Sequence, residues 1–175
     1  IILLFEGSIE VGDIIDVDGL VAEVQEINFR TSSVVTPDNI VMIIPNHKFV
    51  SENVINWTHN HKTTRFRVSV GVSYGSDVEL VSKLLYSCMF NHEDITTSPN
   101  VPIVRFTDFG ESSLDFELLF WSDNHFHIQN TMSALRFRIF KAFADNGIQI
   151  PFPQRDLHLK SSDIGHVEVK TQHSQ

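Results

Sequence analysis

The most informative part of this chain begins Gly7-Ser8-Ile9-Glu10-Val11-Gly12-Asp13 and ends Asn53-Val54-Ile55-Asn56-Trp57. Between them lie three shorter motifs: Arg30-Thr31, Thr36-Pro37-Asp38 and Ile43-Ile44-Pro45-Asn46. The segments that join these motifs are short, alternate in polarity and are rich in β-branched residues. Turn residues that separate such segments are typical of a small all-β barrel.

One pair of strands in this region can be placed closely. Residues 13–17 and 20–24 are two short, mostly apolar segments, and they flank Asp18-Gly19. This dipeptide favours a two-residue hairpin because both turn positions require a positive φ. Residues 49–52 predict one helical turn before a strand at residues 54–58. Five short strands in about fifty residues indicate a strongly bent barrel.

A polar segment, His59–Thr64, is the expected linker, because the periodicity changes after it. Strands are expected at residues 66–72, 101–108, 113–121 and 155–159, and helices at 77–88 and 126–146. Asp77 is the expected N-cap of the first helix, and Gly147 ends the second. The order β-α-β-β-α-β is the ferredoxin-like pattern, an α+β sandwich.

The bulk composition describes an ordinary globular chain. Its 175 residues, 42% of them apolar, suffice for one domain or two small ones. No run approaches the roughly 20 apolar residues that a membrane-spanning helix needs. The chain opens on Ile1 within a motif and without an initiator Met, so we expect it to be part of a longer protein. A single cysteine, Cys88, excludes an intrachain disulfide and suggests a reducing compartment.

Acidic residues are concentrated in the first third of the chain. The net charge is −9, and residues 1–61 hold nine acidic residues against Arg30 and Lys48, a balance of −7. This charge disfavours nucleic acid as a partner, since nucleic-acid binders usually present a basic face. The first segment is therefore expected to be a separate unit.

Motif order and spacing resemble the small-conductance mechanosensitive channel (MscS-like) family, in its soluble C-terminal region. Beyond the first region, the resemblance rests on three strings: Val70-Gly71-Val72-Ser73-Tyr74-Gly75-Ser76-Asp77, Gly110-Glu111-Ser112-Ser113-Leu114-Asp115-Phe116 and Ile150-Pro151-Phe152-Pro153-Gln154. The resemblance implies the end of a pore helix at 1–6, an Sm-like β domain at 7–60, a ferredoxin-like domain at 61–160 and a C-terminal tail at 161–175. In the tail, Val167 and Val169 alternate as in a strand that pairs with other copies.

The resemblance also implies a function. Family members are homoheptameric channels of the bacterial inner membrane, which release ions and small solutes on hypoosmotic shock. The expected role of this chain is the vestibule on the cytoplasmic side of the membrane, soluble by itself and joined to the membrane through N-terminal helices. The expected partners are other copies of the chain and permeating ions, with no nucleic acid and no cofactor.

Two groups of site residues follow from the resemblance. Leu4, Phe5 and Glu6 represent the pore helix, and the turn Pro45, Asn46 and His47 is expected to lie against it, with the Asn46 amide bonding carbonyls at the helix end. Candidate vestibule and portal residues come from the acidic strands and the linker: Asp16, Asp18, Glu23, Glu26, His59, Asn60, His61 and Lys62.

Other chemistry has weaker support. Asp16-Val17-Asp18-Gly19 lacks the later carboxylates of a calcium loop. His59/His61 and His125/His127 lack further metal ligands, and we interpret them as polar residues of a linker and a helix start, which makes a metal site unexpected. Arg136, Arg138 and Lys141 are expected on a solvated helix face. Asp115 and Glu117 are expected to be an exposed strand face, and Cys88 to be a core residue. No catalytic motif is present, so an enzyme is not expected.

Two alternatives remain open at this stage. Sm-like barrels often bind RNA, although the acidic balance and the lack of aromatic residues beside basic ones oppose that function here. Ferredoxin-like domains often act as small-ligand regulatory modules, which would be compatible with the first interpretation.

Overall fold

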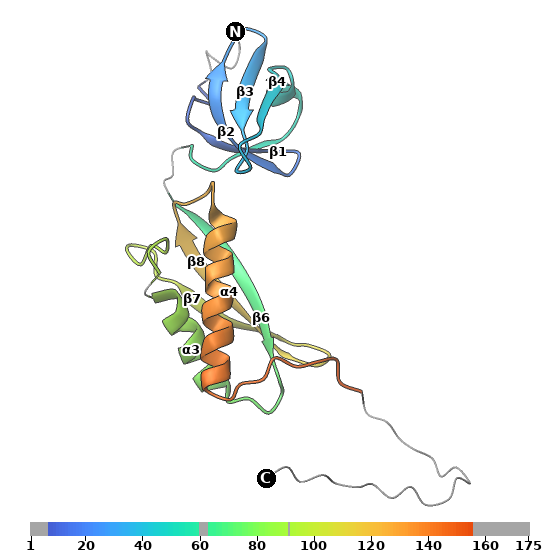
Figure 1. The fold of residues 1–175 in the computed structure, drawn as a ribbon, viewed down its shortest axis with the longest axis vertical. Coiled ribbons are helices and arrows are strands. Elements are labelled where there is room, and N and C mark those ends of the chain that lie inside the picture. The colour runs from blue at the N-terminus through green and yellow to red at the C-terminus, as the bar shows by residue number, and fades with distance from the viewer. Residues whose placement is uncertain (1–6, 60–62, 91, 156–175) are drawn as a thin grey trace, which may run out of the picture.

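The computed structural model describes residues 7–59, 63–90 and 92–155 (Figure 1). Several sequence predictions fall outside these ranges. They are the pore-helix end at Leu4–Glu6, the linker residues Asn60, His61 and Lys62, the last strand beyond Arg155, and the tail strand with Val167 and Val169. We call residues 7–59 the β unit and residues 63–155 the α/β unit.

The β unit contains one antiparallel sheet with the strand order β4-β3-β2-β1-β5. Its elements are β1 (Ile14–Val17), β2 (Leu20–Ile27), β3 (Thr31–Val35), β4 (Val41–Pro45), α2 (Lys48–Ser51) and β5 (Val54–Asn56). The Asp18-Gly19 hairpin is confirmed: Val17 pairs with Leu20, and Asp18 and Gly19 have φ values of 55° and 82°. The helical turn expected at residues 49–52 is α2, shifted by one residue, and β5 ends two residues earlier than expected.

Alternation along these strands fixes the inner face of the sheet. Ile15 on β1 pairs with Ala22 on β2, and both are buried. Val24 continues this face until a bulge between Val24 and Glu26 shifts the register against β3. The β unit therefore has a hydrophobic core of its own, formed by Ile9, Ile15, Val17, Ala22, Val24, Val34, Ile44 and Phe49.

The α/β unit places two helices on one face of a three-stranded antiparallel sheet (Figure 1). Its elements are β6 (Thr64–Val72), α3 (Val78–Phe90), β7 (Ile103–Phe109), β8 (Leu114–Ser122) and α4 (Ile128–Asp145). The strand order is β6-β8-β7, so β6 and β7 are the outer strands of this sheet among the described residues. The first five elements of the expected β-α-β-β-α-β order are present, and the sixth falls almost entirely outside the described residues.

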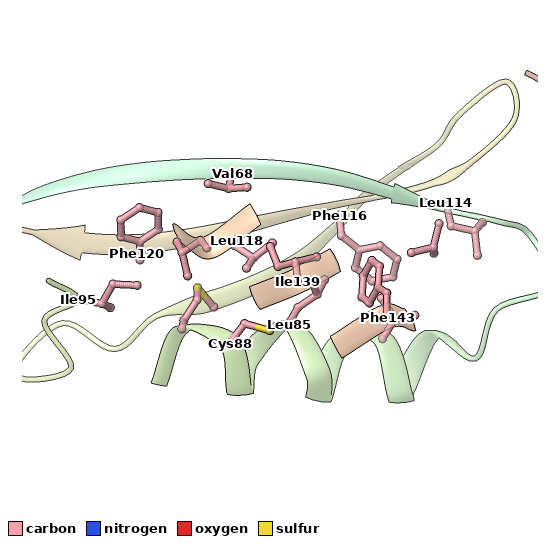
Figure 2. Close-up of a cluster of buried hydrophobic side chains, with 14 of the residues drawn as sticks. Val68, Leu85, Cys88, Ile95, Leu114, Phe116, Leu118, Phe120, Ile139 and Phe143 are labelled. Atoms are coloured by element: carbon pink, nitrogen blue, oxygen red, sulfur yellow. The ribbon is translucent and has the colours of Figure 1, made fainter. Parts of the chain in front are cut away.

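Side chains from the sheet and from both helices interlock to form the core of the α/β unit. Figure 2 shows Phe116, Leu118 and Phe120 of β8 above Leu85 of α3 and Ile139 of α4. Cys88 is buried in this layer, as expected, and burial raises the pKa of its thiol. Along α3, Val78 in the first turn is exposed, while Met89 near the end of the helix is fully buried.

Both helix-end predictions are confirmed. The Asp77 carboxylate accepts hydrogen bonds from the backbone N–H groups of Glu79 and Leu80, at 2.9 and 3.1 Å. Gly147, with a φ of 68°, follows α4, and the N–H of Ile148 bonds back to the carbonyl of Phe143. These contacts satisfy backbone groups that a helix end leaves unpaired. Within the described ranges, none of the helices combines the length and apolarity that crossing a bilayer requires.

Candidate functional site: turn, acidic strands and junction

The turn that follows β4 is fixed by hydrogen bonds within the β unit. The Asn46 amide donates to the Asn28 carbonyl at 2.8 Å, and its side-chain oxygen accepts from the Ser32 hydroxyl at 2.8 Å. The backbone N–H of Asn46 bonds the Arg30 carbonyl. The Asn46 side chain therefore holds the turn at residues 45–47 against the β2–β3 connection. Pro45 and His47 are the exposed residues of the turn at 45–47.

The four acidic vestibule candidates do not form one cluster. Asp16 and Glu23 lie on neighbouring strands and share the outer face of the sheet, because Ile14 pairs with Glu23 and Asp16 with Val21. Asp18 lies in the hairpin turn and forms an ion pair with Lys48 at 3.2 Å. Glu26 is exposed beyond the bulge. The outer face of β1 and β2 therefore carries two of the four carboxylates.

Asp13 joins the two ends of the β unit, and sequence reasoning missed this role. Its carboxylate accepts from the Glu10 N–H (2.9 Å), the Asn56 amide (2.7 Å) and the Thr58 hydroxyl (2.9 Å). The partial burial of Asp13 opposes its charged form. However, these bonds and the nearby His59 outweigh burial and hold the pKa of the carboxyl below its ordinary value. The signal was present in the sequence, since Asp13 and Asn56 belong to the two motifs that bound the region.

Aromatic rings continue from the β unit into the α/β unit. Trp57 stacks on Phe66 at a centroid distance of 5.9 Å, and Phe66 in turn contacts Phe120 and His125. An open recess of about 810 Å³ lies beside these rings. It is lined by Asn56, Trp57, His59, Thr63, Thr64, Arg65, Asn100 and Trp121. His59 is the one described residue of the predicted portal segment, and it lies in this recess.

His125 lies just before α4, at a helix start as expected, but it is a buried residue, which the sequence interpretation did not include. His125 is 4% exposed, and its Nε2 lies 3.0 Å from the Thr64 hydroxyl. Burial lowers the pKa of His125, and the nearby Asp123 only partly opposes this effect. Periodicity could not identify His125 as buried, because it precedes α4 in an irregular segment.

The three strings quoted from the second half of the sequence meet at the far end of the α/β unit. The Tyr74 hydroxyl bonds the Gly110 carbonyl, the Ser73 N–H bonds the Gln149 carbonyl, and the Gln154 N–H bonds the Ser112 hydroxyl. Gly71 is required at this point, because a Cβ there would lie 2.9 Å from the Ser113 Cβ. These contacts fix the direction in which the chain leaves the α/β unit.

Comparison with known proteins agrees with this architecture. Residues 1–59 match the family model described as "Mechanosensitive ion channel, beta-domain", and residues 66–150 match "Mechanosensitive ion channel MscS, C-terminal". Together the two matched segments cover most of the chain.

Full-length relatives show the same likeness. An uncharacterized MscS family protein of Haemophilus influenzae is 38% identical over 97% of this chain and 16% of its own length. The mechanosensitive channel MscK of Escherichia coli is 34% identical over 97% and 15%. The small-conductance mechanosensitive channel of Helicobacter pylori is 36% identical over 93% and 59%. The chain thus spans less than two thirds of each of these relatives.

Solved structures extend the comparison to three dimensions. The closed-state crystal structure of Helicobacter pylori MscS superposes with a TM-score of 0.80 and 34% identity, over 92% of this chain and 63% of that one. Arabidopsis thaliana MSL1 shares the fold, with a TM-score of 0.62 at 14% identity over 86% of this chain and 55% of that one. From both family models, the relatives and the shared fold, we conclude that this chain belongs to the MscS family of mechanosensitive ion channels.

Proposed function

We propose that this chain forms the cytoplasmic vestibule beneath the pore of a tension-gated channel. The observation that carries the proposal is the superposition on the closed Helicobacter pylori channel, which includes both the β unit and the α/β unit. In this proposal each unit is a domain: an Sm-like barrel next to the membrane and a ferredoxin-like domain below it. A ring of copies, seven by family resemblance, would enclose the vestibule.

The turn at Pro45, Asn46 and His47 would be the contact with the pore helix. Asn46 holds this turn through Asn28 and Ser32, so the exposed side chains of Pro45 and His47 are presented on a fixed support. A contact made in one state of the channel shifts the open–closed equilibrium by its differential energy.

Side portals of the vestibule would lie beside the junction recess, where His59 and Arg65 line an opening of about 810 Å³. Asp16 and Glu23 on the outer face of β1 and β2 would raise the cation concentration near the ring. Such an effect decreases with ionic strength, because surface charges are screened within about 8 Å at physiological salt.

A chimera tests this function directly. The pore helices of the Helicobacter pylori channel would be joined to this chain in place of its own soluble region and reconstituted in liposomes. We expect currents that open under membrane tension in patch recordings. Correctly inserted protein that gives no tension-dependent current would refute the proposal. The pore helices joined to an unrelated soluble domain provide the control.

The RNA-binding alternative is testable with the chain itself. The balance of −7 in residues 1–61 opposes a polyanion. In a filter-binding assay with single-stranded RNA at low salt we expect no retention. Micromolar binding that weakens with salt would favour the RNA-binding function instead.

A further inference from the structure

A histidine is buried at the end of the α/β unit that lies nearest the β unit. His125 is 4% exposed and belongs to the segment just before α4. Its Nε2 lies 3.0 Å from the hydroxyl of Thr64, the first residue of β6. Histidine changes its charge near neutral pH. A buried histidine at this place therefore gives the contact between the two units a means of responding to pH.

His125 is connected to the β unit through one aromatic side chain. The edge of Phe66 meets the His125 ring at a centroid distance of 6.1 Å, and Phe66 stacks on Trp57 of the β unit at 5.9 Å. Thr64 and Phe66 lie on the same face of β6, because side chains alternate along a strand. This end of β6 is the one nearest the β unit (Figure 1). His125 thus supports the residue that makes the aromatic contact between the units.

The surroundings of His125 compensate a positive charge poorly. Asp123, in the same segment, is exposed and favours the charged ring, but burial outweighs this attraction and lowers the pKa of His125. Other nearby titratable groups carry positive charge in acid: Arg65 on the opposite face of β6, His59 in the recess beside β6, and His127 at the start of α4. The N-terminus of α4 also disfavours a cation. A protonated ring is therefore more stable in water than in its buried position.

We propose that His125 is a pH-sensitive switch that holds the two units together when neutral and releases them when protonated. The neutral ring stays buried against Thr64 and Phe66 and keeps Phe66 on Trp57. A ring that takes a proton from solvent moves toward water, so Phe66 loses its support and the aromatic contact opens. The switch needs a single copy of the chain and goes beyond the proposed vestibule. Within a vestibule, acid would free the β unit to change its angle to the α/β unit.

The size of the response follows from the two pKa values of His125. In the open state the exposed ring has the ordinary value of about 6.5, and in the closed state its pKa is lower. The closed state is therefore favoured above about pH 6.5 and loses population as the pH falls. Between pH 7.5 and pH 5.5 the ratio of open to closed chains should rise about five- to tenfold. Ordinary carboxylates stay almost fully charged in this range.

Hydrogen exchange of the whole chain, followed by NMR, measures this opening. The Nε1–H of Trp57 is buried and has no hydrogen-bond partner in the part of the chain that the structure describes, so its exchange reports loss of burial. The backbone N–H of Trp57, bonded to the Ile14 carbonyl, reports fraying of the β unit. The backbone N–H of Leu118, fully buried on β8, reports unfolding of the α/β unit.

We expect the opening seen at Trp57 Nε1–H to rise about five- to tenfold from pH 7.5 to pH 5.5, after correction for the chemical exchange rate. It should stay at least tenfold more frequent than the opening seen at Leu118 or at the Trp57 backbone. His125→Gln, which cannot titrate, should remove the rise. His59→Gln in the recess and His92→Gln at the other buried histidine are the matched controls and should retain it.

Each other outcome contradicts the switch. If Trp57 Nε1–H and Leu118 show equal protection at both pH values, the contact opens only when the chain unfolds, and His125 contributes to stability alone. If the rise persists in His125→Gln, another group controls the contact. Should His125→Gln fail to fold, the wild-type chain still decides: a His125 ring that titrates at about 6.5 while opening at Trp57 stays constant refutes the switch. None of these results depends on whether copies form a ring.

Discussion

Replacing Asp13 with alanine should destabilise the β unit far more than an ordinary surface substitution. The Asp13 carboxylate accepts three hydrogen bonds, from the backbone of Glu10 and the side chains of Asn56 and Thr58. At about 1 kcal/mol for each bond in a partly solvated setting, Asp13→Ala should cost about 3 kcal/mol of unfolding free energy. Asp13→Asn keeps one acceptor and should cost about half as much.

Urea unfolding followed by tryptophan fluorescence measures this cost. All variants would also carry Trp121→Phe, so that Trp57 is the one tryptophan that reports unfolding. Trp57 is adjacent to Asn56, whose side chain bonds Asp13. Asp38→Asn is the matched control, because Asp38 is exposed and loses the same charge. If Asp13→Ala lies within 0.5 kcal/mol of this control, near the usual limit for surface changes, the network is not structural. Because the folded-state pKa of Asp13 is lowered, its contribution should be present above about pH 4 and decline as the pH falls below that.

Three further predictions concern the α/β unit. Gly71→Ala should lower the free energy of unfolding by about 1–3 kcal/mol, because the new Cβ would clash with the Ser113 side chain. Gly75→Ala is the control, since a Cβ there meets nothing within 4 Å and should cost no stability. Equal thermal midpoints for the two variants would exclude the crowding argument. Leu135→Ala, at a fully buried position of α4, should lower the free energy of unfolding by about 2–5 kcal/mol. Phe137→Ala, at an exposed position of the same helix, should lower it by under about 1 kcal/mol in the monomer. Chemical unfolding that ranks the two variants in the opposite order would mean that the buried face of α4 is wrongly assigned. Burial lowers the folded-state pKa of both His92 and His125, so the free energy of unfolding should fall as the pH drops below about 6.5. A His92→Asn, His125→Asn double variant should show a weaker dependence of unfolding free energy on pH. An unchanged pH dependence would assign the effect to other groups.

Local signals in the sequence predicted most of the elements correctly. The Asp18-Gly19 hairpin, the Asp77 cap and the Gly147 helix end each depend on a few adjacent residues, so no knowledge of packing was required. The buried apolar positions of α4, Ile128, Leu135, Ile139 and Phe143, recur at the spacing of one helix face.

Long-range contacts could not be read in the same way. Asp13 and Thr58 are 45 residues apart, and His125 meets Thr64 across 61 residues. No periodicity encodes such pairs, since they depend on how strands are ordered in space. Charge counts likewise do not indicate that Asp18 pairs with Lys48 while Glu23 lies on the outer face of the sheet.

The motifs that identify the family turn out to be joints of the structure. The first and last strings of the β unit meet at Asp13 and Asn56, and three later strings meet around Gly71, Tyr74 and Gln154. The hydrogen bonds at these joints are formed within the chain. A protein whose most characteristic residues fix geometry, and leave apolar edges and grooves exposed, is suited to act as a wall built from repeated copies. In the proposed vestibule these joints set the geometry of each copy, so we expect function to be most sensitive to substitutions there.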